Sequence, residues 1–113
     1  MNRKINYTYE QLGNVGIFTL TGELTLANED ELKLILMRAI HSNDRAVLNL
    51  RKVTRVDHHC VHLLRKGYCT SLRLKRPIIL TEVPQNCMKD IYNCDIAETR
   101  DSDWITGQKE NTA

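Results

Sequence analysis

The sequence predicts a single α/β domain: a mixed sheet with helices mainly on one face, in the order β-β-α-β-α-β-α. Stretches rich in β-branched residues alternate with stretches whose apolar residues recur at helical spacing, a pattern typical of parallel strands joined by helices. The first two strands flank the turn signal Gly13-Asn14, so we expect them to form an antiparallel hairpin. A length of 113 residues fits one domain.

The composition is that of an ordinary globular domain, with 42% hydrophobic residues and a net charge of +2. This near balance gives no reason to expect nucleic acid as a partner. No apolar run approaches the ~20 residues that span a bilayer, and the N-terminus lacks the apolar segment of a secretion signal. We therefore expect a cytoplasmic protein with neither a nucleic-acid nor a membrane partner. Its four cysteines are expected to be reduced: Cys60, Cys69, Cys87 and Cys94.

The first half of the chain contains two strands and a helix. Residues 5–11 and 15–22 are rich in strand-forming residue types. A helix is expected to start at Asn28, with Glu31 three residues later in an arrangement that resembles a capping box. It ends at the polar residues 42–44. Its core-facing residues recur at helical spacing: Leu32, Ile35, Leu36, Ala39 and Ile40.

The second half repeats the alternation. Residues 46–53 start with a nearly continuous apolar run, so we expect a strand buried on both faces. Asp57 is a preferred N-cap residue and starts the second helix, which ends before Pro77. Residues 78–83 form the last strand, and a short third helix follows. The domain is expected to occupy residues 1–100, with residues 101–113 as a polar, flexible tail.

The start of the second helix is the candidate functional site. A helix N-terminus carries unpaired N–H groups and partial positive charge, so it is suited to anions and to regulated contacts. Here it presents Asp57-His58-His59-Cys60 at the end of a strand. One stripe of the helix is expected to face solvent: His58, His62, Arg65 and Cys69.

The ordered set of elements resembles the STAS domain, the fold of anti-sigma-factor antagonists and of the cytosolic tails of sulfate transporters. The resemblance covers roughly residues 15–95. Four landmarks support it: a second strand that ends in Gly22-Glu23-Leu24, the amphipathic helix, the strand over residues 47–56 that leads to Asp57, and the strand over residues 78–83.

The resemblance implies a non-enzymatic protein-interaction module of bacterial signalling and transcription regulation, without a cofactor. Its partner would be an anti-sigma factor, a switch kinase or another STAS protein, and a homodimer is a further form left open. The loop after Leu24 and the first half of the second helix would make the contacts. The expected partner-binding residues are Thr25, Leu26, Asp57, His58, His59, His62 and Arg65.

This chain departs from the family at the phosphorylation signature. The family pattern is Asp-Ser-Ser/Thr-Gly, and here it reads Asp57-His58-His59-Cys60. His58 takes the position of the phosphoserine, which makes it a degenerate phosphosite without a hydroxyl group. Thr25 and Asn49 stand where the family has aspartates. The resemblance therefore implies a domain whose usual switch is lost or replaced.

The same residues also suggest other kinds of chemistry. Asp-His-His-Cys is also the signature of protein palmitoyltransferases, which we reject because those enzymes need a cysteine-rich zinc domain between membrane-spanning helices. His58 and His62 are spaced i, i+4, as in helical zinc sites, so a metal-binding or small-molecule sensor is the alternative function. A Cys-His hydrolase would use Cys60, whose pKa a helix N-terminus would lower. Phosphorylation of His58 is a further option.

A basic band lies along and after the second helix. It consists of Arg65, Lys66, Arg73, Lys75 and Arg76. The simplest interpretation is a solvated face, and an acidic protein partner is the main alternative. Nucleic acid is a weaker candidate because no aromatic residues are interleaved with these charges.

Overall fold

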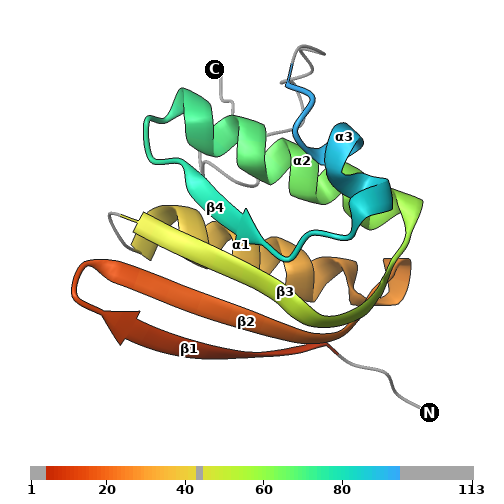
Figure 1. Ribbon diagram of the computed structural model, residues 1–113, viewed down its shortest axis with the longest axis horizontal. Coiled ribbons are helices and arrows are strands. Elements are labelled where there is room, and N and C mark those ends of the chain that lie inside the picture. Colours follow the sequence, from red (N-terminus) through yellow and green to blue (C-terminus); the bar gives the residue numbers. More distant parts are fainter. Residues whose placement is uncertain (1–4, 43–44, 95–113) are drawn as a thin grey trace, which may run out of the picture.

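The computed structural model describes residues 5–42 and 45–94. The elements follow the predicted order (Figure 1). They are β1 (Asn6–Leu12), β2 (Val15–Leu24), α1 (Glu29–Ser42), β3 (Arg45–Val56), α2 (His58–Arg73), β4 (Ile78–Thr81) and α3 (Met88–Ile91), with 3-10 turns at Leu26–Asn28 and Gln85–Cys87. The tail expected at residues 101–113 lies outside the described residues.

The described strands form one sheet in the order β1-β2-β3-β4. β1 and β2 are antiparallel, whereas β2, β3 and β4 are parallel. The expected mixed sheet is therefore confirmed. The hairpin is confirmed as well: Leu12 pairs with Val15 across the two residues Gly13 and Asn14. Gly13 has φ +62°, a left-handed conformation that glycine adopts without a steric penalty.

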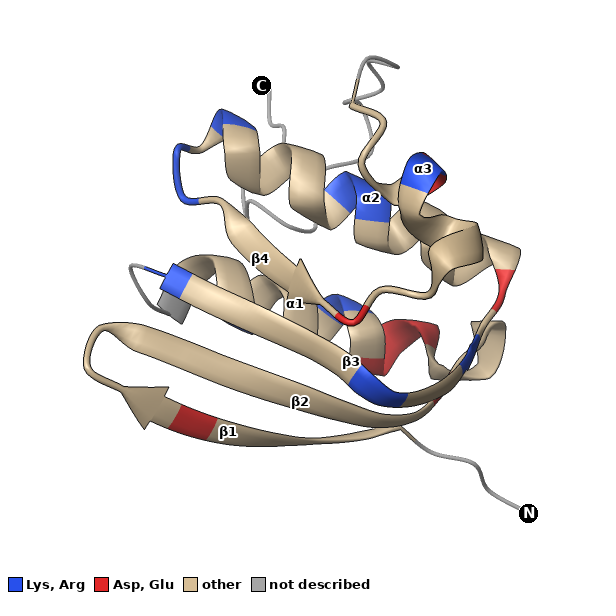
Figure 2. Cartoon of the chain, viewed as in Figure 1, with Lys and Arg blue, Asp and Glu red and all other residues tan. Residues whose placement is uncertain are grey.

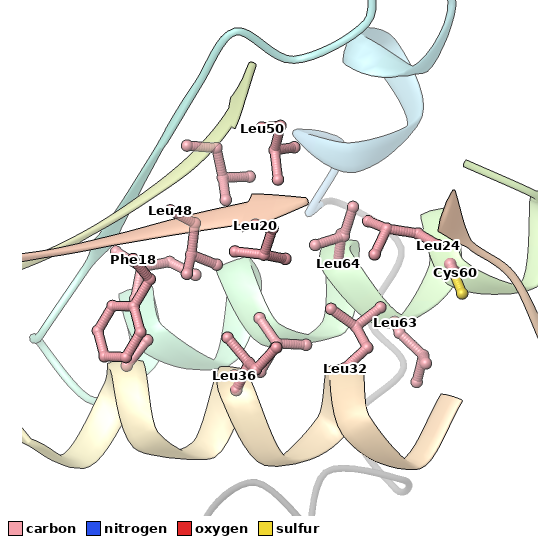
Figure 3. Close-up of a cluster of buried hydrophobic side chains, with 14 of the residues drawn as sticks. Phe18, Leu20, Leu24, Leu32, Leu36, Leu48, Leu50, Cys60, Leu63 and Leu64 are labelled. Atoms are coloured by element: carbon pink, nitrogen blue, oxygen red, sulfur yellow. The ribbon is translucent and has the colours of Figure 1, made fainter. Parts of the chain in front are cut away.

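The hydrophobic core lies between one face of the sheet and the helices α1 and α2 (Figure 3). Every second residue of β2 faces this core, as Phe18 and Leu20 show. The five residues of the first helix that recur at helical spacing are buried as expected: Leu32, Ile35, Leu36, Ala39 and Ile40. Burial of such side chains supplies the main driving force of folding, about 1.5–3 kcal/mol for each large aliphatic residue.

The expectation that β3 is buried on both faces is wrong. Leu48 and Leu50 are fully buried, but Val47 before them and Asn49 between them are only half-buried. The strand therefore alternates, because α1 and α2 cover one face of the sheet. The arrangement agrees with helices mainly on one face of the sheet.

Two irregularities in the pairing of β2 with β3 shift the register, between Thr19 and Thr21 and between Gly22 and Glu23. Next to the first shift, the side-chain Oδ1 of Asn49 accepts a hydrogen bond from the backbone N–H of Arg51, at 2.9 Å. Pairing resumes and continues to the ends of both strands, where Leu24 lies opposite Val56. The end of β3 and the loop after β2 are thereby held side by side.

The expectation that all four cysteines are reduced is wrong for one pair. Cys69 on α2 forms a disulfide with Cys94, which follows α3, and their Cα atoms are 5.6 Å apart. Cys69 is therefore half-buried and does not belong to a solvent-facing stripe. The rings of Tyr68 and Tyr92 meet edge to face at 4.9 Å beside this bridge. The spacing of 25 residues in the sequence does not indicate a disulfide, because only the packing of α3 on α2 brings the two thiols together.

Candidate functional site

Asp57 joins the start of α2 to the loop after β2. Its Oδ1 accepts a hydrogen bond from the backbone N–H of Cys60 at 3.0 Å, which is the predicted N-cap. Its Oδ2 accepts another from the backbone N–H of Leu26 at 2.9 Å. The backbone N–H of Asp57 donates to the carbonyl of Leu24, also at 2.9 Å. One residue thus fixes both segments that the sequence assigned to the partner surface.

The surroundings of Asp57 stabilise the negative charge of its carboxylate. Partial burial raises the pKa of its carboxyl, but the hydrogen bonds from the N–H groups of Cys60 and Leu26 lower it more, and the net pKa lies below its usual value. Asp57 is therefore an anion at neutral pH. Its negative charge occupies the positive end of the α2 dipole.

Two exposed histidines and a half-buried arginine form a row along α2 from its first turn. The rings of His58 and His62 meet edge to face, with centroids 4.9 Å apart. The Nη2 of Arg65 lies 3.1 Å from the Nδ1 of His62, where the guanidinium donates to a neutral imidazole. Burial and then the charge of Arg65 lower the pKa of His62 below its usual value. His62 is therefore neutral near pH 7 and accepts this bond.

His59 points to α1 and not along this row. Its Nε2 lies 3.3 Å from Oε1 of Glu29, whose other oxygen is 3.2 Å from Nζ of Lys33. Hydrogen bonds from Lys33 and His59 lower the pKa of Glu29. Figure 2 shows the acidic residues at the start of α1, close to the start of α2. Glu29 could not be predicted as part of this site, since its one distinguishing feature in the sequence is a place in the acidic first turn of a helix.

The structure places the predicted surface residues together at one end of the domain. Leu26 is 60% exposed. Thr25 is half-buried next to it, and His58, His59 and His62 are exposed. Arg65 lies further along α2 and is half-buried. Arg73, Lys75 and Arg76 of the basic band are exposed at the far end of α2, so they are not part of this site (Figure 2).

Cys60 is unsuited to nucleophilic chemistry. Its side chain is fully buried, and burial followed by the nearby Asp57 carboxylate raises the pKa of its thiol to about 12. A thiol at neutral pH is then almost entirely protonated, and the thiolate is the reactive form. The hydrolase alternative is therefore wrong: the helix N-terminus does not lower this pKa, because the thiol faces the core.

The described residues contain no group of three or more His, Cys, Asp or Glu side chains placed to hold a metal ion. His58 and His62 come close, but their rings meet edge to face. Nor is any helix in the described part of the chain both long and apolar enough to cross a bilayer.

The chain belongs to the STAS domain family. The model of this family matches residues 6–103, which is most of the chain. The structure is also similar to the crystal structure of an anti-sigma factor antagonist from Mycobacterium paratuberculosis, with a TM-score of 0.52 and 14% sequence identity. That alignment covers 77% of this chain and 93% of the other. No curated protein sequence matches significantly. The resemblance inferred from the order of elements is thereby confirmed for family and fold.

Proposed function

We propose that this protein is a non-enzymatic protein-interaction module of bacterial signalling that acts like an anti-sigma-factor antagonist. Its docking surface consists of Thr25, Leu26, Asp57, His58, His59, His62 and Arg65. The partner is an anti-sigma factor, a switch kinase or another STAS protein. Membership of the STAS family and the similarity to a solved antagonist support the general class.

One observation carries the choice of surface: the Asp57 carboxylate accepts hydrogen bonds from both Cys60 and Leu26. These bonds turn a loop and a helix start, distant in sequence, into one fixed surface. A surface whose backbone is already fixed loses little conformational entropy when a partner binds. Exposed Leu26 supplies an apolar contact to this surface, and the histidines and Arg65 supply polar contacts.

The same surface contains the position that carries the phosphoserine in the family pattern. His58 stands there, so this residue offers no hydroxyl to a serine kinase. We infer that docking here does not depend on phosphorylation of that position. Substitution of His58 by glutamate would bring a negative charge beside the carboxylate of Asp57. This added charge mimics the effect of a phosphate in a switchable relative.

Affinity capture with paired variants tests this proposal. The full chain is immobilised as wild type, His58→Glu, Leu26→Glu and Leu34→Glu, and each is incubated with native bacterial lysate. Leu34 is the matched control because it is a leucine on α1 that is 48% exposed and lies outside the docking surface. We expect a STAS protein, switch kinase or anti-sigma factor that binds wild type and Leu34→Glu but neither of the other two.

Equal capture by all four proteins would contradict the assigned surface, and capture of none of the three classes would contradict the assigned function. A metal-binding or small-molecule sensor that uses His58 and His62 stays the alternative function. A cytoplasmic location stays a prediction. The Cys69–Cys94 disulfide is more typical of oxidising compartments. The redox state of these two cysteines in the cell therefore tests the predicted cytoplasmic location.

A further inference from the structure

A concave site lies at the opposite end of α1 from the docking surface. It is a cleft of about 450 Å³ lined by Tyr7, Tyr9, Phe18 and Arg38. This volume is in the range of pockets that bind small molecules. Arg38 follows Glu29, the α1 residue in contact with His59, by nine positions. That spacing corresponds to about 14 Å along a helix.

The strand pairing explains how three aromatic rings meet at this place. Tyr9 of β1 pairs with Phe18 of β2, and Tyr7 pairs with Leu20. Paired residues share a face of the sheet, so both tyrosines lie on the face that carries the core. Phe18 is only 3% exposed and forms the floor, at the end of the core above α1 (Figure 3). Tyr9 is 45% exposed and forms an open wall.

The rings are arranged as a concave surface. The Phe18 ring lies 5.6 Å from that of Tyr7 at an interplanar angle of 37°, and 4.9 Å from that of Tyr9 at 60°. Tyr9 is the most exposed of the three rings, and Phe18 reaches the surface with only a small part of its ring. A planar aromatic ligand would therefore pack mainly against Tyr9, with Phe18 beneath it.

Of the four described residues that line the cleft, Arg38 carries the charge. Its Nη1 donates a hydrogen bond to the hydroxyl of Tyr7 at 2.9 Å, which holds the guanidinium at the rim. A guanidinium is planar and matches a carboxylate with two parallel hydrogen bonds. The favoured ligand thus has an aromatic ring at one end and a carboxylate at the other.

We propose that this cleft binds a small planar aromatic carboxylate, with the ring against Tyr9 and Phe18 and the carboxylate on Arg38. The site goes beyond the proposed function, because none of its residues belongs to the docking surface. Failure of one proposal therefore leaves the other intact.

Naphthalene-2-carboxylate is the probe, and naphthalene-2-carboxamide is its uncharged control. Each is titrated into the ¹⁵N-labelled full chain while amide chemical shifts are recorded. We expect saturable shifts at β1, at Phe18 and around Arg38, with affinity for the carboxamide weaker by about tenfold, as loss of a charge-assisted hydrogen bond implies. Absence of saturable shifts, equal affinity for the carboxamide, or shifts confined to α2 would overturn the proposal.

Three variants assign the binding to the named side chains. Arg38→Met removes the charge and keeps the stem, and we expect affinity for the probe to fall about tenfold. Tyr9→Ala removes the open wall and is expected to weaken both probes. Arg73→Met on α2 is the matched control and should bind like wild type, since Arg73 is an exposed arginine outside the cleft. Circular dichroism confirms that each variant is folded. Unchanged affinity in Arg38→Met would contradict the role of the guanidinium.

Discussion

Leu36 of α1 packs directly over Gly67 of α2: a Cβ atom built on Gly67 would lie 2.9 Å from Cδ2 of Leu36. Both residues are buried. We expect Gly67→Ala to lower the free energy of unfolding. Overpacking costs about 1–3 kcal/mol, whereas the better helix propensity of alanine returns about 1 kcal/mol. Urea denaturation of the two proteins measures the difference.

The same substitution should change sign when Leu36 is shortened. In a Leu36→Ala background the clash is gone, and Gly67→Ala is then expected to stabilise by up to about 1 kcal/mol. A double-mutant cycle of the four proteins gives the coupling between the two sites. Equal effects of Gly67→Ala in both backgrounds would show that the helix contact is not what requires a glycine.

Asp57→Ala should destabilise the domain and loosen the docking surface. Loss of an N-cap side chain costs about 0.5–2 kcal/mol. Asp57→Asn keeps one side-chain oxygen as an acceptor, so we expect it to retain part of this stability. The carboxylate also bonds to Leu26, so amide hydrogen exchange at Leu26 should be faster in both variants than in wild type. Unchanged exchange at Leu26 in Asp57→Ala would contradict the role of this bond.

The contribution of Asp57 should also depend on pH. Its pKa is lower in the folded protein than the ordinary value of 3.8, so the folded state favours the ionised form. The stabilisation is therefore fully present above that ordinary value and is lost as the pH falls through the lower pKa of the folded state. The difference in unfolding free energy between wild type and Asp57→Ala should be larger at neutral pH than at pH ~2. A difference independent of pH would contradict this.

The sequence was sufficient for the architecture because its signals are local. The helical spacing of Leu32 and Leu36, the Gly13 turn and the Asp57 cap each act within a few residues, and the structure has all three. The burial of β3 was misjudged for a different reason. Its apolar run leaves open whether a second layer covers the outer face, so Val47 could not be placed.

Contacts between segments that are distant in the sequence could not be predicted from it. Cys69 and Cys94 meet because α3 packs on α2, and His59 meets Glu29 because α1 and α2 start side by side. Neither pair has a spacing that marks it. The reactivity of Cys60 was misjudged because the direction of its side chain, and not its place at a helix start, decides its pKa.

Arg65→Gln should raise the pKa of His62. Burial and then the positive charge of Arg65 lower this pKa, so removal of the charge moves it toward the ordinary value of 6.5. A titration of the imidazole followed by NMR measures the shift. Arg73→Gln is the control, because Arg73 is not among the groups that lower this pKa. Equal titration curves for wild type and Arg65→Gln would mean that the contact between Arg65 and His62 does not persist in solution.

Reduction of the Cys69–Cys94 disulfide should lower the stability of the domain. The two residues are 25 positions apart, and loss of a cross-link that closes such a loop costs about 3.5 kcal/mol in the chain-entropy model. Urea denaturation with and without dithiothreitol measures the change. The double variant Cys69→Ser/Cys94→Ser should resemble the reduced protein and should not respond to dithiothreitol. A wild-type protein that is equally stable in both conditions would contradict a bridge between these residues.

Lys75→Gly should stabilise the domain, although it removes a side chain. Lys75 lies two residues after the end of α2 and has φ +62°. Its backbone N–H donates to the carbonyl of Leu72, and the backbone N–H of Arg76 donates to the carbonyl of Ser71. This pattern favours glycine at the left-handed position, where a side chain costs about 1–2 kcal/mol. The greater freedom of glycine in the unfolded chain takes back about 0.5–1 kcal/mol, so we expect a net gain of up to about 1 kcal/mol in the free energy of unfolding. Lys75→Ala is the control: it removes the same charge, keeps the Cβ atom and should give no gain. A similar gain from alanine would assign the effect to charge and not to backbone conformation.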